Sequence, residues 1–137
     1  MHQELQLDRT SIKSIVVHTD SDADSSRYSI SSGVVNPQQQ VEAQFSLPYL
    51  ISCALVLGKV GIDQINAFND PKVLATASII RAERKDGMPK GQTELVVTCD
   101  NGASCSLVLL PPSGSPNNPL STKQLEEKFR DCAAHAL

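Results

Sequence analysis

Tyr49 is the side chain whose type and position in this sequence best suit chemistry. A phenol hydroxyl can donate a hydrogen bond to a carboxylate or pass a proton to a reacting group. Ser46, three residues earlier, brings a second hydroxyl into the same short segment. Both residues also have structural interpretations, because tyrosines often lie in the core and serines often cap helices. From the residue types alone, we favour the structural interpretation of Tyr49.

The other reactive side chains form no recognisable metal or nucleophile motif. The cysteines and histidines are scattered along the chain, at Cys53, Cys99, Cys105, Cys132, His2, His18 and His135. None of their spacings is that of a zinc site, or of a base beside a nucleophile. Ser113-Gly114-Ser115 lacks the preceding strand and following helix of a phosphate-binding loop. We therefore expect no metal site, and cysteines that pack as small apolar residues.

The composition argues against several classes of protein. The 137 residues carry 12 Lys and Arg against 15 Asp and Glu, without the clustered basic surplus of a duplex-binding domain. Aromatic residues make up 4% of the chain, too few for a platform that stacks single-stranded nucleic acid. No apolar run approaches the roughly 18 residues that a membrane helix needs, and the N-terminal residues do not resemble a secretion signal. The sequence predicts one cytoplasmic globular domain over residues 1–137 that binds neither nucleic acid nor a membrane.

The helical region that contains Tyr49 is interrupted by a proline. Apolar residues recur at helical spacing over residues 43–57, and a glycine follows at once. Asn36 can cap the N-terminus of this region, with a proline next to it as the first helical residue. Pro48 cannot donate to the helical hydrogen-bond ladder, so either one helix kinks there or a second helix begins with Ser46 as its N-cap.

Strands and helices are interspersed along the rest of the chain. We expect strands at 11–19, 79–85, 93–100 and 103–110, helices at 62–68, from 71 through 77 and from 122 onward, and loops at 20–32, 86–91 and 111–119. Ser121 and Gln124 can form a capping box at the start of the last helix. In that helix Leu125, Phe129 and Cys132 share one apolar face. This order predicts an α+β fold, a two-layer sandwich of an antiparallel sheet packed against helices.

The register of the predicted hairpin follows from burial. A three-residue loop with Gly102 in the left-handed conformation places Val97 opposite Cys105 and makes one face of the hairpin wholly apolar. A two-residue loop would mix polar and apolar side chains on both faces. We therefore predict the three-residue loop. Cys99 and Cys105 are then only diagonal neighbours, too far apart for an unstrained disulfide.

Longer stretches of the sequence resemble the MmgE/PrpD family. The residues that carry the resemblance are Glu42 to Tyr49, Ala54 to Val60, Asp70 to Val73, Asp100 to Gly102, Asn118 to Ser121 and Glu127 to Phe129. They occur in the family's order and together span about residues 11–134. Known members include 2-methylcitrate dehydratase, cis-aconitate decarboxylase and iminodisuccinate epimerase.

The resemblance implies that the chain is the smaller α+β lid domain of such a protein. In the family a large helical domain carries the principal catalytic lysine, histidine and aspartate residues, and the active site lies in the cleft between the domains. Nothing in this sequence matches those residues. The tyrosine of the family's A-x-x-S-x-x-Y pattern corresponds to Tyr49. The resemblance therefore implies Tyr49 as a catalytic and substrate-binding residue, with Ser46 as a second substrate-binding residue that helix capping explains equally well.

Two functions remain open at this stage. The first is the lid of a cofactor-free lyase or isomerase that acts on small polycarboxylates, inactive alone and paired with a helical domain on the same or a separate chain. The second is a free-standing, non-catalytic module that keeps the lid fold for binding or self-association. The first predicts exposed apolar side chains where the helical domain docks, whereas the second predicts a polar surface there.

Overall fold

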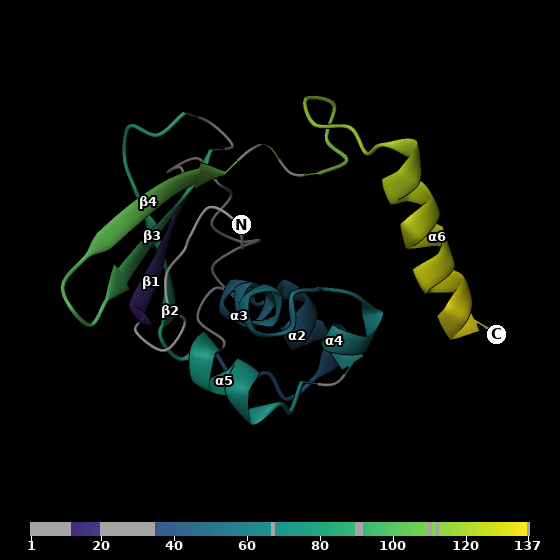
Figure 1. Ribbon diagram of the computed structural model, residues 1–137, viewed down its shortest axis with the longest axis horizontal. Helices are drawn as coiled ribbons and strands as arrows, with labels where there is room; N and C mark the ends of the chain where they lie inside the picture. Colours follow the sequence, from purple (N-terminus) through teal and green to yellow (C-terminus); the bar gives the residue numbers. More distant parts are fainter. Residues whose placement is uncertain are drawn as a thin grey trace.

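Figure 1 shows the chain as a four-stranded sheet with helices against one face and a C-terminal helix set apart from it. This is the mixed α+β fold that the sequence predicts, with helices and sheet in contact. The computed structural model describes residues 12–19, 35–66, 68–89, 92–109, 111 and 113–136. The predicted loop at 20–32 lies outside the described residues.

The sheet is mostly antiparallel, in the order β2-β1-β3-β4. Its strands are β1 (Ile12–Thr19), β2 (Ile80–Arg84), β3 (Thr93–Cys99) and β4 (Ser104–Leu109). β3 pairs antiparallel with both β1 and β4, whereas β1 and β2 are parallel. Parallel neighbours need a crossover connection, and the helices that follow β1 provide it. The prediction of an antiparallel sheet therefore holds for two of the three strand pairs described.

The main core lies between the sheet and helix α3 (Leu47–Leu57). Successive side chains of a strand point to opposite faces, and the buried ones in β1 and β3 alternate accordingly. The buried side chains of this core are Ile15, Val17, Ile80, Leu95 and Val97. Ile51 and Leu55 of α3 pack against them. Burial of this apolar surface holds α3 to the sheet.

The hairpin between β3 and β4 has the predicted three-residue loop. Val97 pairs with Cys105 and Leu95 with Leu107. Gly102 has a φ of +84°, and its N–H donates to the carbonyl of Cys99 at 3.0 Å. A left-handed residue at this point is what a three-residue loop requires. Cys99 lies opposite Ala103 and Cys105 opposite Val97, so the two free thiols are diagonal neighbours, as the register predicts.

Five helices are described. They are α2 (Gln40–Phe45), α3 (Leu47–Leu57), α4 (Ile62–Asn66), α5 (Pro71–Ala77) and α6 (Thr122–Ala136). Of the two alternatives at Pro48, the structure has the second, in which α2 ends and α3 begins with Ser46 as its N-cap. Pro48 falls in the first turn of α3, where a missing N–H costs nothing. The proline therefore starts a helix here instead of bending one.

The predicted start of the first helix at Asn36 is wrong. α2 begins at Gln40, and its N-cap, Gln39, makes no side-chain capping bond. The Glu42 carboxylate instead accepts a hydrogen bond from the Gln38 backbone N–H, with 2.8 Å between nitrogen and oxygen. This bond satisfies a backbone donor ahead of the helix, so the Asn36 side chain is not needed as a cap.

Gly58 ends α3 in the left-handed conformation, and this gives a testable prediction. Its φ is +71°, and a Cβ placed there would meet no heavy atom within 4 Å. Gly58→Ala is therefore expected to lower the free energy of unfolding by ~1 kcal/mol through backbone strain alone. Gly58→Asn should cost less, because asparagine adopts this conformation more readily. Urea denaturation of the two variants tests this, and equal losses would contradict it.

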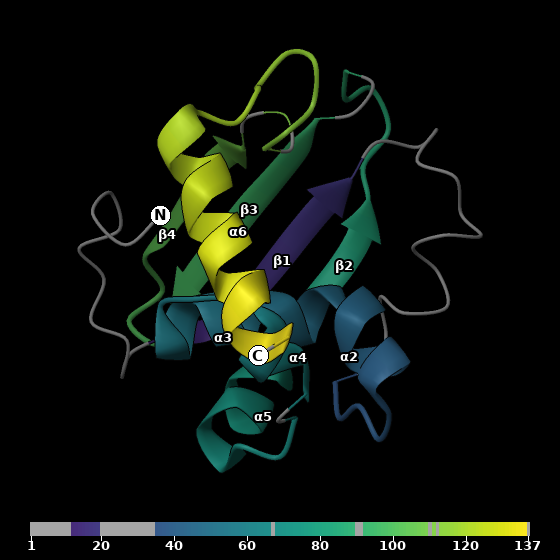
Figure 2. The same cartoon turned by 90° about the vertical axis from the view of Figure 1, so that its right-hand side faces the viewer.

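α6 stands apart from the rest of the described chain. Its capping box is as predicted, because the Ser121 hydroxyl accepts from the Gln124 N–H and the Gln124 side chain accepts from the Ser121 N–H. Figures 1 and 2 show α6 on the same side of the sheet as α3. None of its described side chains is buried, and Leu125 and Phe129 are 53% and 73% exposed. The apolar face predicted for this helix is therefore uncovered.

Candidate functional site

The break between α2 and α3 fixes the position of Tyr49. Ser46 is fully buried, and its hydroxyl oxygen accepts a hydrogen bond from the Tyr49 backbone N–H at 3.1 Å. Its carbonyl accepts the bond of the Leu50 N–H at 3.0 Å. The structural interpretation of Ser46 as a helix cap is thus confirmed, while its role in binding a substrate stays a prediction.

The Tyr49 side chain connects α3 to α4. The residue is 1% exposed and packs with Ala43, Cys53 and Val73 in a second apolar cluster. Its hydroxyl donates a hydrogen bond to the backbone carbonyl of Gln64, with 2.5 Å between the two oxygens. Gln64 belongs to α4, a helix of five residues. The phenol therefore holds this short helix in place.

The surroundings of Tyr49 restrict the chemistry that it can perform. Burial raises the pKa of the Tyr49 phenol, and the neighbouring Cys53 thiol and Asp70 carboxylate raise it further. Burial also raises the pKa of the Cys53 thiol. Tyr49 is therefore protonated at neutral pH, where it can donate a hydrogen bond or a proton but cannot serve as a base.

A hollow of about 620 Å³ lies over α4 and the start of α5. Its lining residues are Leu57, Asp63, Gln64, Asn69, Asp70, Pro71 and Lys72. Gln64 both lines this hollow and accepts the hydrogen bond of Tyr49, so the phenol lies directly behind its wall. The lining has two carboxylates and one ammonium group, so by itself it does not favour a polyanion.

The sequence interpretation missed the lining residues of this hollow. Gln64 follows Tyr49 by 15 residues, and nothing in the intervening residues marks it as a partner of the phenol. Asp70 caps α5, because its carboxylate accepts from the Lys72 and Val73 backbone N–H groups. The hollow arises where these elements meet, and no local pattern predicts that meeting.

A second polar cluster lies on the sheet face opposite α3. His18 of β1 is the cross-strand neighbour of Glu83 on β2 and Glu94 on β3. The Glu94 carboxylate lies 3.3 Å from the His18 Nδ1 and 2.7 Å from the Lys85 ammonium. Both contacts, that with Lys85 first, hold the pKa of Glu94 below its ordinary value. Cross-strand pairing accounts for this cluster without a ligand.

Neither a metal site nor a membrane span is found in the described part of the chain. No group of three or more His, Cys, Asp and Glu side chains in these ranges could hold a metal ion. None of the helices described is both long enough and apolar enough to cross a bilayer. The candidate site consists of Tyr49, Ser46 and the hollow beyond Gln64, which the Ser46 cap and the Tyr49–Gln64 hydrogen bond connect.

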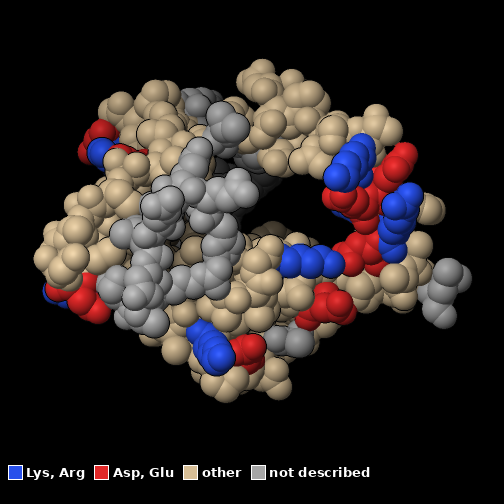
Figure 3. All heavy atoms as spheres, viewed as in Figure 1, with Lys and Arg blue, Asp and Glu red and all other residues tan. Residues whose placement is uncertain are grey.

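Charged side chains gather on α6, at the right of the view in Figure 3. Two ion pairs one turn apart run along the helix, with 3.8 Å between Lys123 and Glu127 and 3.8 Å between Arg130 and Glu126. Exposed pairs of this kind add little stability each. They leave the apolar face of the helix, with Leu125 and Phe129, without cover from the described residues.

Comparison with known proteins agrees with the order of sequence features and with the fold. The family model of the MmgE/PrpD C-terminal domain matches residues 1–137, the full length of the sequence. A search of curated proteins found no match. Because the family model covers the whole sequence, the chain belongs to the MmgE/PrpD C-terminal domain family.

Proposed function

We propose that this chain is the lid domain of a lyase or isomerase that acts on small polycarboxylates. It forms one wall of the substrate cleft as a single domain, and the family's N-terminal helical domain forms the other. The observation that carries the proposal is the family match over residues 1–137, which implies association with that domain. The finer assignment to dehydration, decarboxylation or epimerisation depends on residues of the other wall.

Tyr49 is the residue of this chain that we assign to the reaction. Its protonated phenol suits donation to a substrate carboxylate or to a leaving group. The hydroxyl now donates to the Gln64 carbonyl at the edge of the 620 Å³ hollow. A substrate oxygen that enters from this side would take the place of that carbonyl. Ser46 supports Tyr49 by holding its backbone N–H at the start of α3.

The charge of the hollow supports the need for a second domain. A polycarboxylate brings two or more negative charges, and Lys72 is the cation among the described lining residues, beside Asp63 and Asp70. Binding of the anion therefore requires cationic groups from the N-terminal domain. Tyr49 remains protonated and cannot be the base that removes a substrate proton, so we assign that base to the N-terminal domain as well.

The exposed apolar side chains point to a missing partner. The large ones are Val41, Phe45, Leu57, Val60, Val108, Leu125 and Phe129. Phe45 lies at the end of α2, next to the Ser46 cap of α3, so apolar surface is exposed close to the candidate site. These residues do not form the purely polar surface that the free-standing module predicts.

Reconstitution tests the proposal. The full chain is mixed with an N-terminal helical domain of the family and assayed with cis-aconitate, 2-methylcitrate and iminodisuccinate. We expect no turnover by either part alone, a complex in sedimentation, and turnover of one of these acids by the complex. If the chain forms a dimer and does not bind the helical domain, the alternative of a self-associating module is correct.

A further inference from the structure

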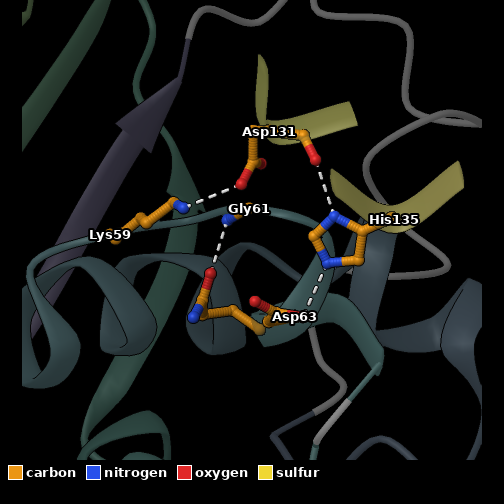
Figure 4. Close-up of polar contacts among 6 residues, drawn as sticks. Lys59, Gly61, Asp63, Asp131 and His135 are labelled. Atoms are coloured by element: carbon orange, nitrogen blue, oxygen red, sulfur yellow. Dashed lines mark hydrogen bonds and ion pairs between the residues drawn. The ribbon is translucent and has the colours of Figure 1, made fainter. Parts of the chain in front are cut away.

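Two polar contacts connect α6 to the body of the fold, which we define as β1–β4 and α2–α5 (Figure 4). The His135 Nε2 lies 2.7 Å from a carboxylate oxygen of Asp63 in α4. The Lys59 ammonium lies 3.0 Å from a carboxylate oxygen of Asp131. Asp131 and His135 are one helical turn apart and face the same segment of the body. These two contacts form what we call the latch.

The latch is not backed by apolar packing. No described side chain of α6 is buried, and Phe129 is 73% exposed. The described residues ahead of α6 are tied mainly to each other, because the Gly114 N–H donates to the Asn118 carbonyl and the Asn118 N–H donates to the Ser115 carbonyl within one tight turn. Since apolar burial supplies most of the energy that holds an element in place, polar contacts must set the position of α6.

Both ring nitrogens of His135 face oxygen acceptors. The Nδ1 lies 2.7 Å from the backbone carbonyl of Asp131, and the Nε2 lies 2.7 Å from the Asp63 carboxylate. A neutral imidazole has one N–H, so it can satisfy one of these oxygens but not both. Only the protonated ring donates to both. The geometry of the latch therefore requires a charged His135.

We propose that α6 is a hinged arm that protonated His135 latches to Asp63, and that the arm is released from the body when His135 loses its proton. The Lys59–Asp131 ion pair, in which the Lys59 side chain is 57% exposed, adds little stability by itself and does not hold the arm once the His135 contact is lost. The charged groups that face the ring are Asp63 from α4 and Asp131 from α6 itself, with Lys59 behind Asp131.

The direction of the switch follows from the two pKa shifts. The Asp131 carbonyl and then the Asp63 carboxylate raise the pKa of His135 above its ordinary value of 6.5. Its contribution is therefore complete below 6.5 and is lost as the pH rises through the higher pKa of the folded state. The same contact lowers the pKa of Asp63 from 3.8, so the contribution of the Asp63 carboxylate to the latch is lost only in stronger acid. The latch is closed between these limits.

We expect release of α6 to change the surroundings of the Tyr49 side chain as well. Asp63 precedes Gln64, whose carbonyl accepts the hydrogen bond of the Tyr49 hydroxyl. The Gln64 side chain also accepts from the Gly61 N–H at 2.8 Å, in the turn between Lys59 and Asp63 (Figure 4). The latch therefore connects α6 to α4, the helix whose Gln64 carbonyl contacts the phenol. This connection does not depend on whether Tyr49 contacts a substrate.

NMR of the full isotope-labelled chain tests the latch. Residual dipolar couplings of residues 122–136 and of β1 and β3 are recorded from pH ~5.5 to ~8.5, with the His135 ring shifts in the same samples. At the acid end we expect α6 and the sheet to share one alignment tensor. At the alkaline end we expect the couplings of α6 to shrink by averaging, with the midpoint at the measured pKa of His135 and a matching shift of the Tyr49 ring signals.

Two matched carboxylate variants make the test specific. Asp63→Ala should leave α6 released at every pH, with averaged couplings already at the acid end. Glu127→Ala removes an exposed carboxylate of α6 whose ion-pair partner, Lys123, lies on the same helix, so it should keep the transition of the unchanged protein. The proposal is overturned if the couplings of α6 do not change with pH, or if Asp63→Ala retains the same transition.

Discussion

Tyr49→Phe is expected to lower turnover about 10²–10⁴-fold when the chain is assembled with an N-terminal helical domain of the family. The substitution removes the hydroxyl that donates to the Gln64 carbonyl and keeps the ring that packs on Ala43 and Val73. Substrate affinity should change less than the rate if the proton donor acts mainly in the transition state. Steady-state kinetics of the reconstituted complex gives both quantities.

A matched variant separates this chemical effect from a structural one. Ser52 lies on the same helix as Tyr49, is equally buried, and its hydroxyl also donates to a backbone carbonyl, that of Val73. Ser52→Ala and Tyr49→Phe should each cost about 1 kcal/mol of stability through the lost hydrogen bond. Only Tyr49→Phe should reduce turnover strongly. Undiminished turnover in Tyr49→Phe would remove the phenol from the reaction.

The raised pKa of Tyr49 adds a condition on the pH profile. Because burial keeps the phenol protonated through the neutral range, its deprotonation should not limit the rate on the alkaline side of neutrality. Any alkaline loss of activity in that range must then come from groups of the other domain or from the release of α6. Asp63→Ala distinguishes these sources, because its α6 is already released at every pH, so an alkaline loss that comes from the release of α6 should be absent from the pH profile of this variant.

Ile15→Ala is expected to lower the free energy of unfolding by about 2–5 kcal/mol. Ile15 is 1% exposed at the centre of the sheet, where β1 pairs with both β2 and β3. The substitution leaves a cavity between the sheet and α3 that close-packed neighbours fill only in part. A domain of this size has a total stability of roughly 5–15 kcal/mol, so a large share of it would be lost. Urea denaturation measures the change.

Val108→Ala is the control for this prediction. It also replaces a β-branched strand residue with alanine, but Val108 is 54% exposed on β4. Its cost should stay within about 0.5 kcal/mol, as is usual for surface substitutions. Similar losses in the two variants would mean that the sheet and α3 are not the main core of the protein.

Much of the local structure could be predicted from the sequence because its causes lie within a few residues. Ser46 caps α3, Asp70 caps α5, and Ser121 with Gln124 forms the capping box of α6. The three-residue loop at Gly102 followed from the requirement that one face of the hairpin be apolar. The prediction failed at Asn36, where Glu42 satisfies a backbone donor instead. That bond takes the place of a cap at Asn36, and the capping pattern by itself does not predict the bond.

The tertiary structure decided what no short pattern contains. The parallel pairing of β1 with β2 depends on how four intervening helices cross the sheet. The contacts of the latch join residues that are 72 positions apart, and the hollow beyond Gln64 forms where α3, α4 and α5 meet. By itself the sequence determined the caps, the hairpin register and the family pattern that ends at Tyr49, since these are encoded by neighbouring residues. Only the tertiary structure places Tyr49 behind Gln64 and His135 beside Asp63, because long-range packing sets both positions.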